Sequence, residues 1–340
     1  MPTRENILEY ISARDSATGK ELCDRLGISR QALNVHMRAL IDSGQIVKSG
    51  STRGARYYHH QRAPAAVAFN RSLMLSGLDE SRVYEEIATT LNLRAALSTN
   101  VESIVHYAFT EMLNNAIEHS KTERCRTLVR LEAGKIAFEI RDDGVGVFRS
   151  ITDKFGLQDE HEAMIELLKG RTTTMPEAHT GEGIFFTAKM ADRFVLRSHR
   201  IQIEWDRARD DVFVSEPRYR KGTTVDFELR RDARILREDV FSRFAPEEYD
   251  YQFQKTTVLV KLLKSEYISR SEAKRLIANL EKFREIEFDF RDTQRLGQGF
   301  ADEIFRIFAN RHPEITIHVL NTNPIIDAMI RHVTESPPER

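Results

Sequence analysis

Cysteine, proline, glycine and tryptophan are all scarce in this chain of 340 residues, which holds two cysteines, nine prolines, 16 glycines and one tryptophan. Cys23 and Cys125 lie outside any C-x-x-C pair, so they predict neither a disulfide framework nor a zinc cluster and favour a reducing cytoplasm. The low proline and glycine content excludes fibrous or low-complexity character. No apolar run approaches the roughly 18 to 20 residues of a membrane span, so no membrane partner is expected.

An excess of charge of either sign is also absent, because 51 lysines and arginines stand against 52 aspartates and glutamates. A net charge of -1 argues against a protein that holds nucleic acid by its overall charge, provided that the charge is evenly spread. The composition, 41% apolar and 30% charged, is that of a globular protein, and the length predicts more than one hydrophobic core.

The first sixty residues predict three short helices followed by a hairpin. Thr18 and Glu21 have the spacing of a capping box at the start of the second helix, and Gly27 ends that helix. Ser29 can cap the third helix, and a basic hairpin follows over 45–58. The buried face of the third helix is predicted to consist of Leu33, Met37 and Leu40.

This order of elements, over residues 20–58, resembles the winged helix-turn-helix superfamily. Between residues 29 and 60 there are five bases and one acid, so this stretch carries a net charge of +4 inside a chain of net charge -1. Residues 1–62 are therefore interpreted as a domain that binds double-stranded DNA, with docking to a protein as the alternative. The residues expected to contact DNA are Arg30, Gln31, Asn34, Arg38, Arg53 and Arg56.

Residues 63–100 keep a helical apolar pattern and are interpreted as a helical connector. Residues 101–232 mix helices with a mostly antiparallel sheet, which predicts an α+β sandwich. Helices are predicted near 101–118 and after residue 183, a long polar loop near 148–180, and strands near 125–131, 135–141, 194–198, 201–206 and 223–229.

Two polar motifs of this region lie on the first helix and at the end of a strand. Glu111 and Asn115 are one helical turn apart, which places a carboxylate and a carboxamide on one face and suits Mg²⁺. Asp142 ends a strand and precedes Gly144 and Gly146, so an acceptor for the amino group of adenine lies beside backbone that a ligand can approach closely. Each motif alone also fits a solvated helix face or an ordinary Asp-Gly turn.

Two further motifs follow in the chain. Thr180, Gly181 and Gly183 lead into a helix, whose N-terminal N–H groups and dipole form a phosphate site. Thr223 begins a strand, where its hydroxyl can join a network around the base. Either motif alone is weak evidence for a nucleotide site. The prediction rests on the presence of all four motifs in this order along the chain.

Together the four motifs resemble the N, G1, G2 and G3 boxes of the GHKL (Bergerat, histidine kinase-like) ATP-binding fold over residues 101–230. The resemblance implies ATP and Mg²⁺ as cofactors and an ATP lid over 148–180. It implies that Asn115 ligates Mg²⁺ and that Glu111, as the catalytic residue, orients or deprotonates the attacking group. The other implied cofactor contacts are Asp142, Gly144, Gly146 and Thr223 at the adenine and Thr180, Gly181 and Gly183 at the phosphates.

The C-terminal part, residues 250–335, follows a charged linker near 230–248 and alternates β and α segments, which predicts a small sheet covered by helices. Its run from Phe300 to Glu303 makes it resemble the STAS-like domains found behind GHKL domains. The STAS domains of anti-sigma antagonists carry a phosphorylatable serine just before that helix, whereas residues 296–300 contain no serine or threonine and Thr293 is the nearest. This domain is therefore interpreted as an interaction or dimerisation surface.

The sequence thus predicts a multidomain α+β chain with an N-terminal winged helix, a central GHKL α/β sandwich and a small C-terminal STAS-like α/β domain. The expected function is a cytoplasmic, ATP-responsive, DNA-binding transcriptional regulator in which Mg-ATP alters domain arrangement. The alternative is a GHKL protein kinase of the anti-sigma serine-kinase type; a histidine kinase is disfavoured because His106 lies too close to Glu111 to be its acceptor. Weak ATPase activity, purely structural ATP, a homodimer and a protein partner are left open.

Overall fold

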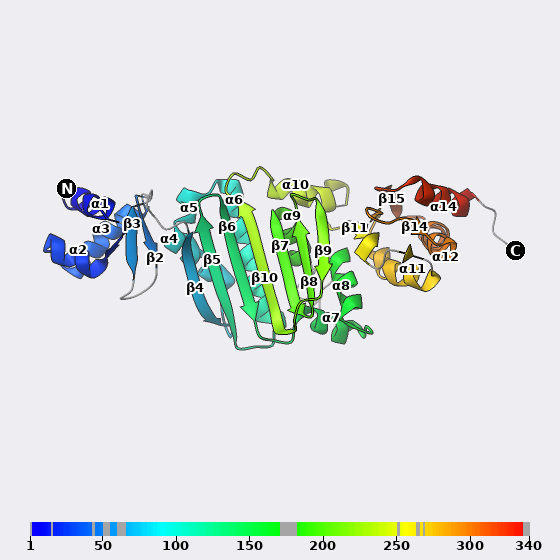
Figure 1. Ribbon diagram of the computed structural model, residues 1–340, viewed down its shortest axis with the longest axis horizontal. Helices are drawn as coiled ribbons and strands as arrows, with labels where there is room; N and C mark the ends of the chain where they lie inside the picture. Colours follow the sequence, from blue (N-terminus) through cyan, green and yellow to red (C-terminus); the bar gives the residue numbers. More distant parts are fainter. Residues whose placement is uncertain are drawn as a thin grey trace. The chain divides into compact units, whose positions relative to one another are not determined.

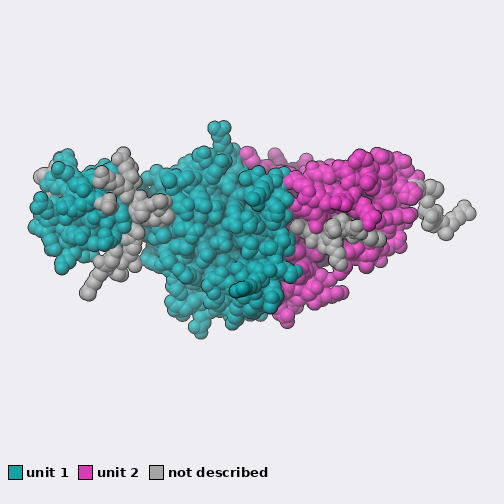
Figure 2. Space-filling view, viewed as in Figure 1, with its two compact units in different colours: residues 1–147, 187–237 teal, residues 148–186, 238–340 magenta. Residues whose placement is uncertain are grey.

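The chain folds into two compact units that both mix helices and strands (Figure 2). One unit comprises residues 1–147 and 187–237, and the other comprises 148–186 and 238–340. No helix in the described ranges is long and apolar enough to cross a membrane. The computed structural model describes residues 2–14, 16–42, 45–49, 55–59, 66–170, 182–249, 252–262, 266–267 and 269–335.

The N-terminal part of the first unit is a helical trio with a small antiparallel sheet, as the sequence predicts. The capping box of Thr18 and Glu21 is present, and Ser29 Oγ accepts the Ala32 N–H at 3.2 Å. The helices are α1 (Pro2–Ser12), α2 (Gly19–Leu26) and α3 (Arg30–Asp42), and the strands β1 (Ala17–Thr18), β2 (Ile46–Ser49) and β3 (Arg56–His59) pair in the order β1-β3-β2. The core contains Ile7, Ile11, Leu22, Leu33, Met37, Leu40, Ile46 and Tyr57.

The rest of the first unit is built on a seven-stranded, fully antiparallel sheet. Its order is β4-β5-β6-β10-β7-β8-β9, and α6 lies behind it in Figure 1. The strands are β4 (Ala66–Met74), β5 (Arg124–Glu132), β6 (Lys135–Asp142), β7 (Arg193–His199), β8 (Ile201–Asp206), β9 (Asp211–Ser215) and β10 (Arg220–Arg230). The helices beside them are α4 (Glu80–Leu91), α5 (Leu93–Ala96) and α6 (Thr99–His119).

Alternate residues of the central strands face α6 and form an apolar layer. Phe138 of β6 meets Phe109 of α6 edge to face with ring centroids 5.5 Å apart, and it stacks on Phe227 of β10 at 4.8 Å. All three side chains are at most 1% exposed. This layer fixes α6, and with it Glu111 and Asn115, against the strand that ends in Asp142.

The predicted helical connector is wrong over 66–74, because this segment is strand β4. It pairs with β5 from Ala66 opposite Glu132 to Met74 opposite Arg124, so the segment belongs to the main sheet. Pairing with β5 at the edge of the sheet stabilises residues 66–74 as a strand more than their weak helical preference stabilises a helix. Residues 80–96 are helical as expected, in α4 and α5. Strand β9 was not anticipated.

The second unit contains a three-stranded parallel sheet in the order β11-β13-β15. The long polar loop predicted near 148–180 is wrong over its described part, which forms α7 (Val147–Phe155) and α8 (Glu160–Lys169). Asp159 caps α8 by accepting two backbone N–H groups, and α7 has a strong apolar face, so both helices have local signals. The charged linker predicted near 230–248 contains α10 (Arg237–Phe244).

The remaining elements of this unit follow the predicted alternation of strands and helices. Helix α9 (Gly183–Met190) begins in the second unit and ends in the first. The strands are β11 (Lys255–Leu259), β12 (Glu266–Tyr267), β13 (Glu285–Asp289), β14 (Arg295–Leu296) and β15 (Thr316–Leu320). The helices are η3 (Glu247–Tyr249), η4 (Val260–Leu262), α11 (Arg270–Ile277), η5 (Leu280–Lys282), α12 (Gln298–Asp302), η6 (Glu303–Phe308), α13 (Ala309–Arg311) and α14 (Pro324–Glu335).

A buried ion pair within α8 is tied by hydrogen bonds to the C-terminal end of α11 in the second unit. Lys169 is 1% exposed, and its Nζ donates to Glu166 Oε1 at 2.5 Å and to the Ala278 carbonyl at 2.8 Å. Asn279 donates to the other Glu166 oxygen at 3.0 Å, and Thr256 donates to the Lys169 carbonyl at 2.6 Å. Helix α8 is therefore part of the same core as β11 and α11.

Candidate functional site

Asp142 ends β6 as a buried carboxylate with one oxygen already engaged. Its Oδ1 accepts the backbone N–H of Gly144 at 2.8 Å and that of Thr223 at 3.3 Å. Burial raises the pKa of Asp142, and these two hydrogen bonds act in the opposite direction. Within the described residues no partner of Oδ2 is found, so this oxygen can accept a hydrogen bond from a ligand. Asp142 and Thr223, predicted separately, are thus brought together.

The backbone around Asp142 can be built only with glycine at three positions. A Cβ at Gly144 would lie 1.9 Å from the Ser120 carbonyl oxygen, and one at Gly222 would lie 2.2 Å from the Asp142 carbonyl oxygen. Gly146 has a φ of +83°, and a Cβ there would lie 2.6 Å from Ser198 Oγ. The three glycines therefore form a cradle at the end of the sheet beside a buried acceptor.

The predicted N-box residues lie on α6, one turn apart. Glu111 and Asn115 are both half-buried on this helix. The Asn115 amide nitrogen is buried and has no hydrogen-bond partner among the described residues. A buried amide without a partner is costly in a folded protein, so this group points to a ligand. Since amide nitrogen and oxygen are assigned rather than observed, either atom can be the one that meets the ligand.

Thr223 completes the first-unit part of the site. Its Oγ1 accepts the backbone N–H of Val147 at 3.0 Å, and the Val145 N–H donates to the Ser120 carbonyl at 2.9 Å. These two bonds fix the turn that carries Gly144 and Gly146 after β6. The sequence predicts that the Thr223 hydroxyl joins a network around the base, and in the structure this hydroxyl accepts a hydrogen bond from the turn beside Asp142.

Of the predicted phosphate-binding residues, Gly183 is the first residue of α9. It lies in the second unit, and Phe185 and Phe186 behind it pack in a phenylalanine cluster with Phe244 and Phe253. Thr180 and Gly181 lie outside the described residues, as do 171–179 of the predicted lid.

Two features of the site were not assigned a role by sequence reasoning. The Ser120 carbonyl is the surface against which Gly144 packs, and Gly222 brings β10 against the Asp142 backbone. A glycine directly before Thr223 was a usable signal for the second feature. The contact between Gly144 and Ser120 depends on a backbone carbonyl, so no residue type in the sequence indicates it.

The DNA-contacting residues predicted on α3 are all exposed. Gln31, Asn34 and Arg38 recur at helical spacing on one face, and Val35 between them is 65% exposed. The opposite face carries the buried residues Leu33, Met37 and Leu40. An exposed row of amide, guanidinium and apolar groups on a helix of this kind suits base edges in a major groove.

The remaining basic residues of this region have different surroundings. The Arg30 guanidinium lies beside Gly19, whose Cβ would be 3.5 Å from its central carbon. Arg56, on β3, is exposed and donates to Ser16 Oγ at 2.8 Å. Arg53 lies outside the described residues. Arg30 is the first residue of α3 and Arg56 begins β3, and both are exposed, as phosphate contacts require.

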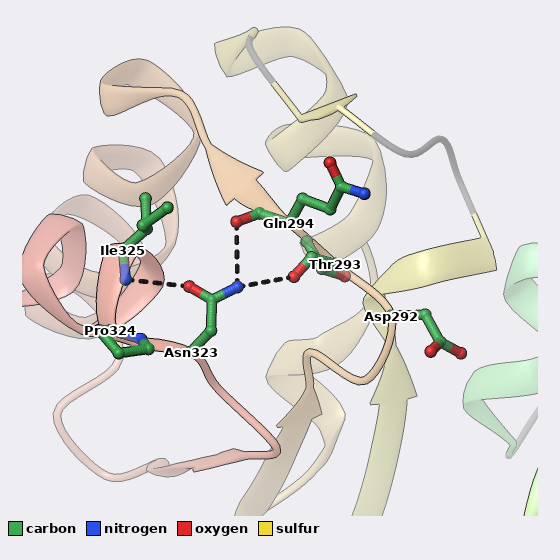
Figure 3. A pocket seen from close by; sticks show the side chains of 6 residues that line it. All are labelled: Asp292, Thr293, Gln294, Asn323, Pro324 and Ile325. Carbon is green, nitrogen blue, oxygen red and sulfur yellow. Dashed lines mark hydrogen bonds between the residues drawn. The ribbon is translucent and has the colours of Figure 1, made fainter.

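The second unit has an open depression of about 750 Å³ between the loop after β13 and the start of α14 (Figure 3). Asn323 donates from Nδ2 to the carbonyls of Thr293 and Gln294 at 3.1 and 3.0 Å, and its Oδ1 accepts the Ile325 N–H at 2.9 Å (Figure 3). Thr293 is 5% exposed. The hydroxyl nearest to the expected phospho-acceptor position is therefore buried.

Three models of known families match the chain. Residues 2–47 match a winged helix-turn-helix DNA-binding family, residues 76–203 a histidine kinase-like ATPase domain, and residues 272–327 a STAS-like domain of unknown function. No curated protein matches the chain by sequence. The predicted order of the three domains is confirmed, and the ATPase match begins within the segment interpreted as a connector.

Proposed function

Because the chain combines a winged helix-turn-helix, a histidine kinase-like ATPase domain and a STAS-like domain, we propose that it is an ATP-responsive, DNA-binding regulator of transcription. The observation that carries the ATP response is Asp142, a buried carboxylate with one oxygen held by Gly144 and Thr223 and the other available to a ligand. In the glycine cradle, that oxygen can accept the exocyclic amino group of adenine.

The side chains that would hold Mg-ATP have distinct roles. Asn115 would supply its carboxamide oxygen to the metal, and its buried nitrogen, which has no hydrogen-bond partner among the described residues, fits a site completed by a ligand. Glu111, one turn away, orients or deprotonates a water or hydroxyl. Thr180, Gly181 and Gly183 would supply N–H groups to the phosphates at the start of α9. When bound, Mg²⁺ would neutralise phosphate charge.

Helix α8 of the second unit can link nucleotide binding to a change in structure. The segment interpreted as the ATP lid includes α8, and the buried pair of Lys169 and Glu166 makes α8 part of the STAS-like core. A change in the position of α8 on nucleotide binding would therefore involve the core of the second unit. ATP shifts the equilibrium between two domain arrangements only to the extent that it binds them with different affinity.

The test is a DNA-binding titration of the full chain with and without Mg-ATP, over a range of salt concentrations. We expect ATP to change the DNA affinity of the wild type and not that of Asp142→Ala. Asp143→Ala is the matched control, because this neighbouring carboxylate is 66% exposed and pairs with Arg141. Equal ATP responses of wild type and Asp142→Ala would contradict the proposal.

The serine-kinase alternative differs from a regulator in where the γ-phosphate of ATP goes. A kinase transfers it to a protein, whereas a regulator only binds ATP or releases the phosphate to water. We expect Glu111→Ala to keep ATP affinity and to lose turnover, because a carboxylate beside the metal ligand acts on the attacking group and not on the base. Incubation with labelled ATP, with phosphate release and protein labelling measured in parallel, checks this. Labelled serine or threonine on the chain or on a STAS partner would favour the kinase, and undiminished turnover in the variant would remove the role of Glu111.

A further inference from the structure

Figure 1 shows the sheet with α6 on one side of it. The strand register places two rows of side chains of different charge across the opposite face. One, the arginine row, consists of Arg126, Arg141, Thr224, Arg197 and Gln202 on β5, β6, β10, β7 and β8. The other, the acidic row, lies two residues along each strand and consists of Leu128, Glu139, Asp226, Val195 and Glu204.

The arginine row is not neutralised within the unit. Arg141 and Arg197 each keep a buried Nε without a hydrogen-bond partner in the described ranges. Arg126 is exposed and donates from Nε to the neutral Asn70 Oδ1 at 3.3 Å. Arg141 reaches only the exposed Asp143, at 2.9 Å, among the acids of the described residues. Guanidinium groups in this state favour carboxylate partners from outside.

The acidic row also contains carboxylates that lack an ion-pair partner within the described residues. Asp226 lies directly opposite Glu139 in the β6–β10 pairing, and like charges at such positions destabilise a sheet. Glu204 is paired with Arg193 at 2.7 Å. For Asp226 and Glu139 the structure shows no ion pair within 4 Å in the part of the chain that it describes. Arg130 and Arg193, in the next row of the same face, act on Asp226 electrostatically without an ion pair within 4 Å in the described residues. The acidic row therefore keeps charge that a partner can neutralise.

We propose that two copies of the chain associate through this face, about a twofold axis that runs along the rows. Such an axis places the arginine row of each copy on the acidic row of the other, strand for strand. Arg141 then meets Glu139 of the partner subunit, and Gln202 meets Glu204 of the partner subunit. Thr224 and Val195, each 4% exposed, form the floor of the face between these contacts. Each contact occurs twice, and Arg126 and Arg197 pack their apolar stems on Leu128 and Val195.

The size of the face suits a stable interface. Seven strands about 4.8 Å apart, and about 20 Å long, form a surface of roughly 600 Å² on each copy, or about 1,200 Å² in total. Apolar side chains stand at its two edges on the same side, Met74 on β4 at 49% exposure and Phe213 on β9 at 39%. Two sheets packed in this way lie about 10 Å apart with nearly aligned strands.

Charge favours a second copy over nucleic acid as the occupant. A phosphate backbone laid on the arginine row would lie within about 7 Å of Glu139 and Asp226, where it is repelled. The proposal is independent of the ATP and DNA residues, since Asp142 faces the other side of the sheet and α3 is not part of it.

The test uses charge reversal in the full chain. Glu139→Arg alone and Arg141→Glu alone each place like charges at both contacts, so we expect each variant to be monomeric where the wild type is dimeric. An equimolar mixture of the two variants restores opposite charge at both contacts, and we expect it to form heterodimers. Sedimentation equilibrium with one variant carrying a fluorescent label measures this.

Arg82→Glu is the control, because this arginine on α4 is 88% exposed and lies outside the proposed face. We expect it to leave the dimer intact. A monomeric wild type, a dimer that survives both reversals, or a mixture that stays monomeric although circular dichroism shows both variants folded would each overturn the proposal. Monomers whose affinity for random-sequence DNA rises with Glu139→Arg and falls with Arg141→Glu would identify a polyanion as the occupant instead.

Discussion

Asp226 is the residue whose environment conflicts most with its charge. Burial raises its pKa to about 6, and the Glu139 carboxylate opposite contributes in the same direction. In the unfolded chain an aspartate has a pKa of about 3.9, so the folded state binds the proton more tightly. The favourable contribution of the protonated group is complete below about pH 4 and is lost as the pH rises through about 6.

Asp226→Asn should therefore raise the free energy of unfolding at pH 8 and change it little near pH 4. The amide keeps the shape of the side chain and removes the charge that burial disfavours. Chemical denaturation at several pH values and at one protein concentration measures the effect. Asp232→Asn, at an 84% exposed site, is the control and should show no such pH dependence. A variant less stable than the wild type at pH 8 would contradict the argument.

At the scale of single residues, side-chain chemistry could be predicted and backbone geometry could not. Asp142 and the glycines after it follow a strand with clear alternation, so their place at its end was readable. The Ser120 carbonyl that excludes a Cβ at Gly144 depends on how α6 ends against that strand. Such a contact arises only from tertiary packing.

At the scale of elements, α8 depends on the ion pair between Lys169 and Glu166. Lys169→Met should destabilise the second unit by about 3–5 kcal/mol, because the buried Glu166 carboxylate then loses its ion-pair partner. Thermal unfolding followed by circular dichroism, with ATP binding measured alongside, checks this.

A matched double variant separates the charge from the packing. Lys169→Met combined with Glu166→Leu removes both charges and should recover a large part of the lost stability. Should the double variant be less stable than Lys169→Met alone, the hydrogen bonds to Ala278 and Asn279 rather than the ion pair hold α8.

Local signals identified most elements, and pairing partners explain the errors. The long helix α6 and strands β5 to β8 and β10 have strong periodicity and lie where expected. Strand β4 was predicted as helix because its strand state depends on β5, which comes some fifty residues later. Helices α7 and α8 are predicted as loop because the segment is polar on average, although each helix has an apolar face that its periodicity could have shown.

At the scale of the whole molecule, charge is segregated and not absent. The chain has a net charge of -1, yet residues 29–60, which include α3 and the hairpin, carry a net charge of +4. DNA binding should therefore weaken steeply with salt, and Arg38→Ala should reduce the slope of log affinity against log salt by about 1 if this side chain contacts a phosphate. Fluorescence anisotropy at several salt concentrations measures the slope.

Arg82→Ala serves as the control for this experiment, since the residue lies on α4. It should leave both affinity and slope unchanged. If Arg38→Ala instead lowers affinity for one sequence and keeps the slope, its guanidinium reads a base edge and not the backbone. A paired arrangement of two chains would further predict two half-sites in the bound DNA.

The second unit is assembled from two stretches of chain, with four strands of the first unit synthesised between them. On the ribosome, α8 emerges long before β11 and α11, whose backbone carbonyls and hydroxyl hold Lys169. The sheet of the first unit can form during synthesis. The Lys169 and Glu166 side chains of α8 stay solvated until β11 and α11 have been made. Completion of the last hundred residues is thus the event that buries Lys169 and Glu166, and a ribosome stalled before them carries a finished sheet together with an α8 that still lacks its packing partners.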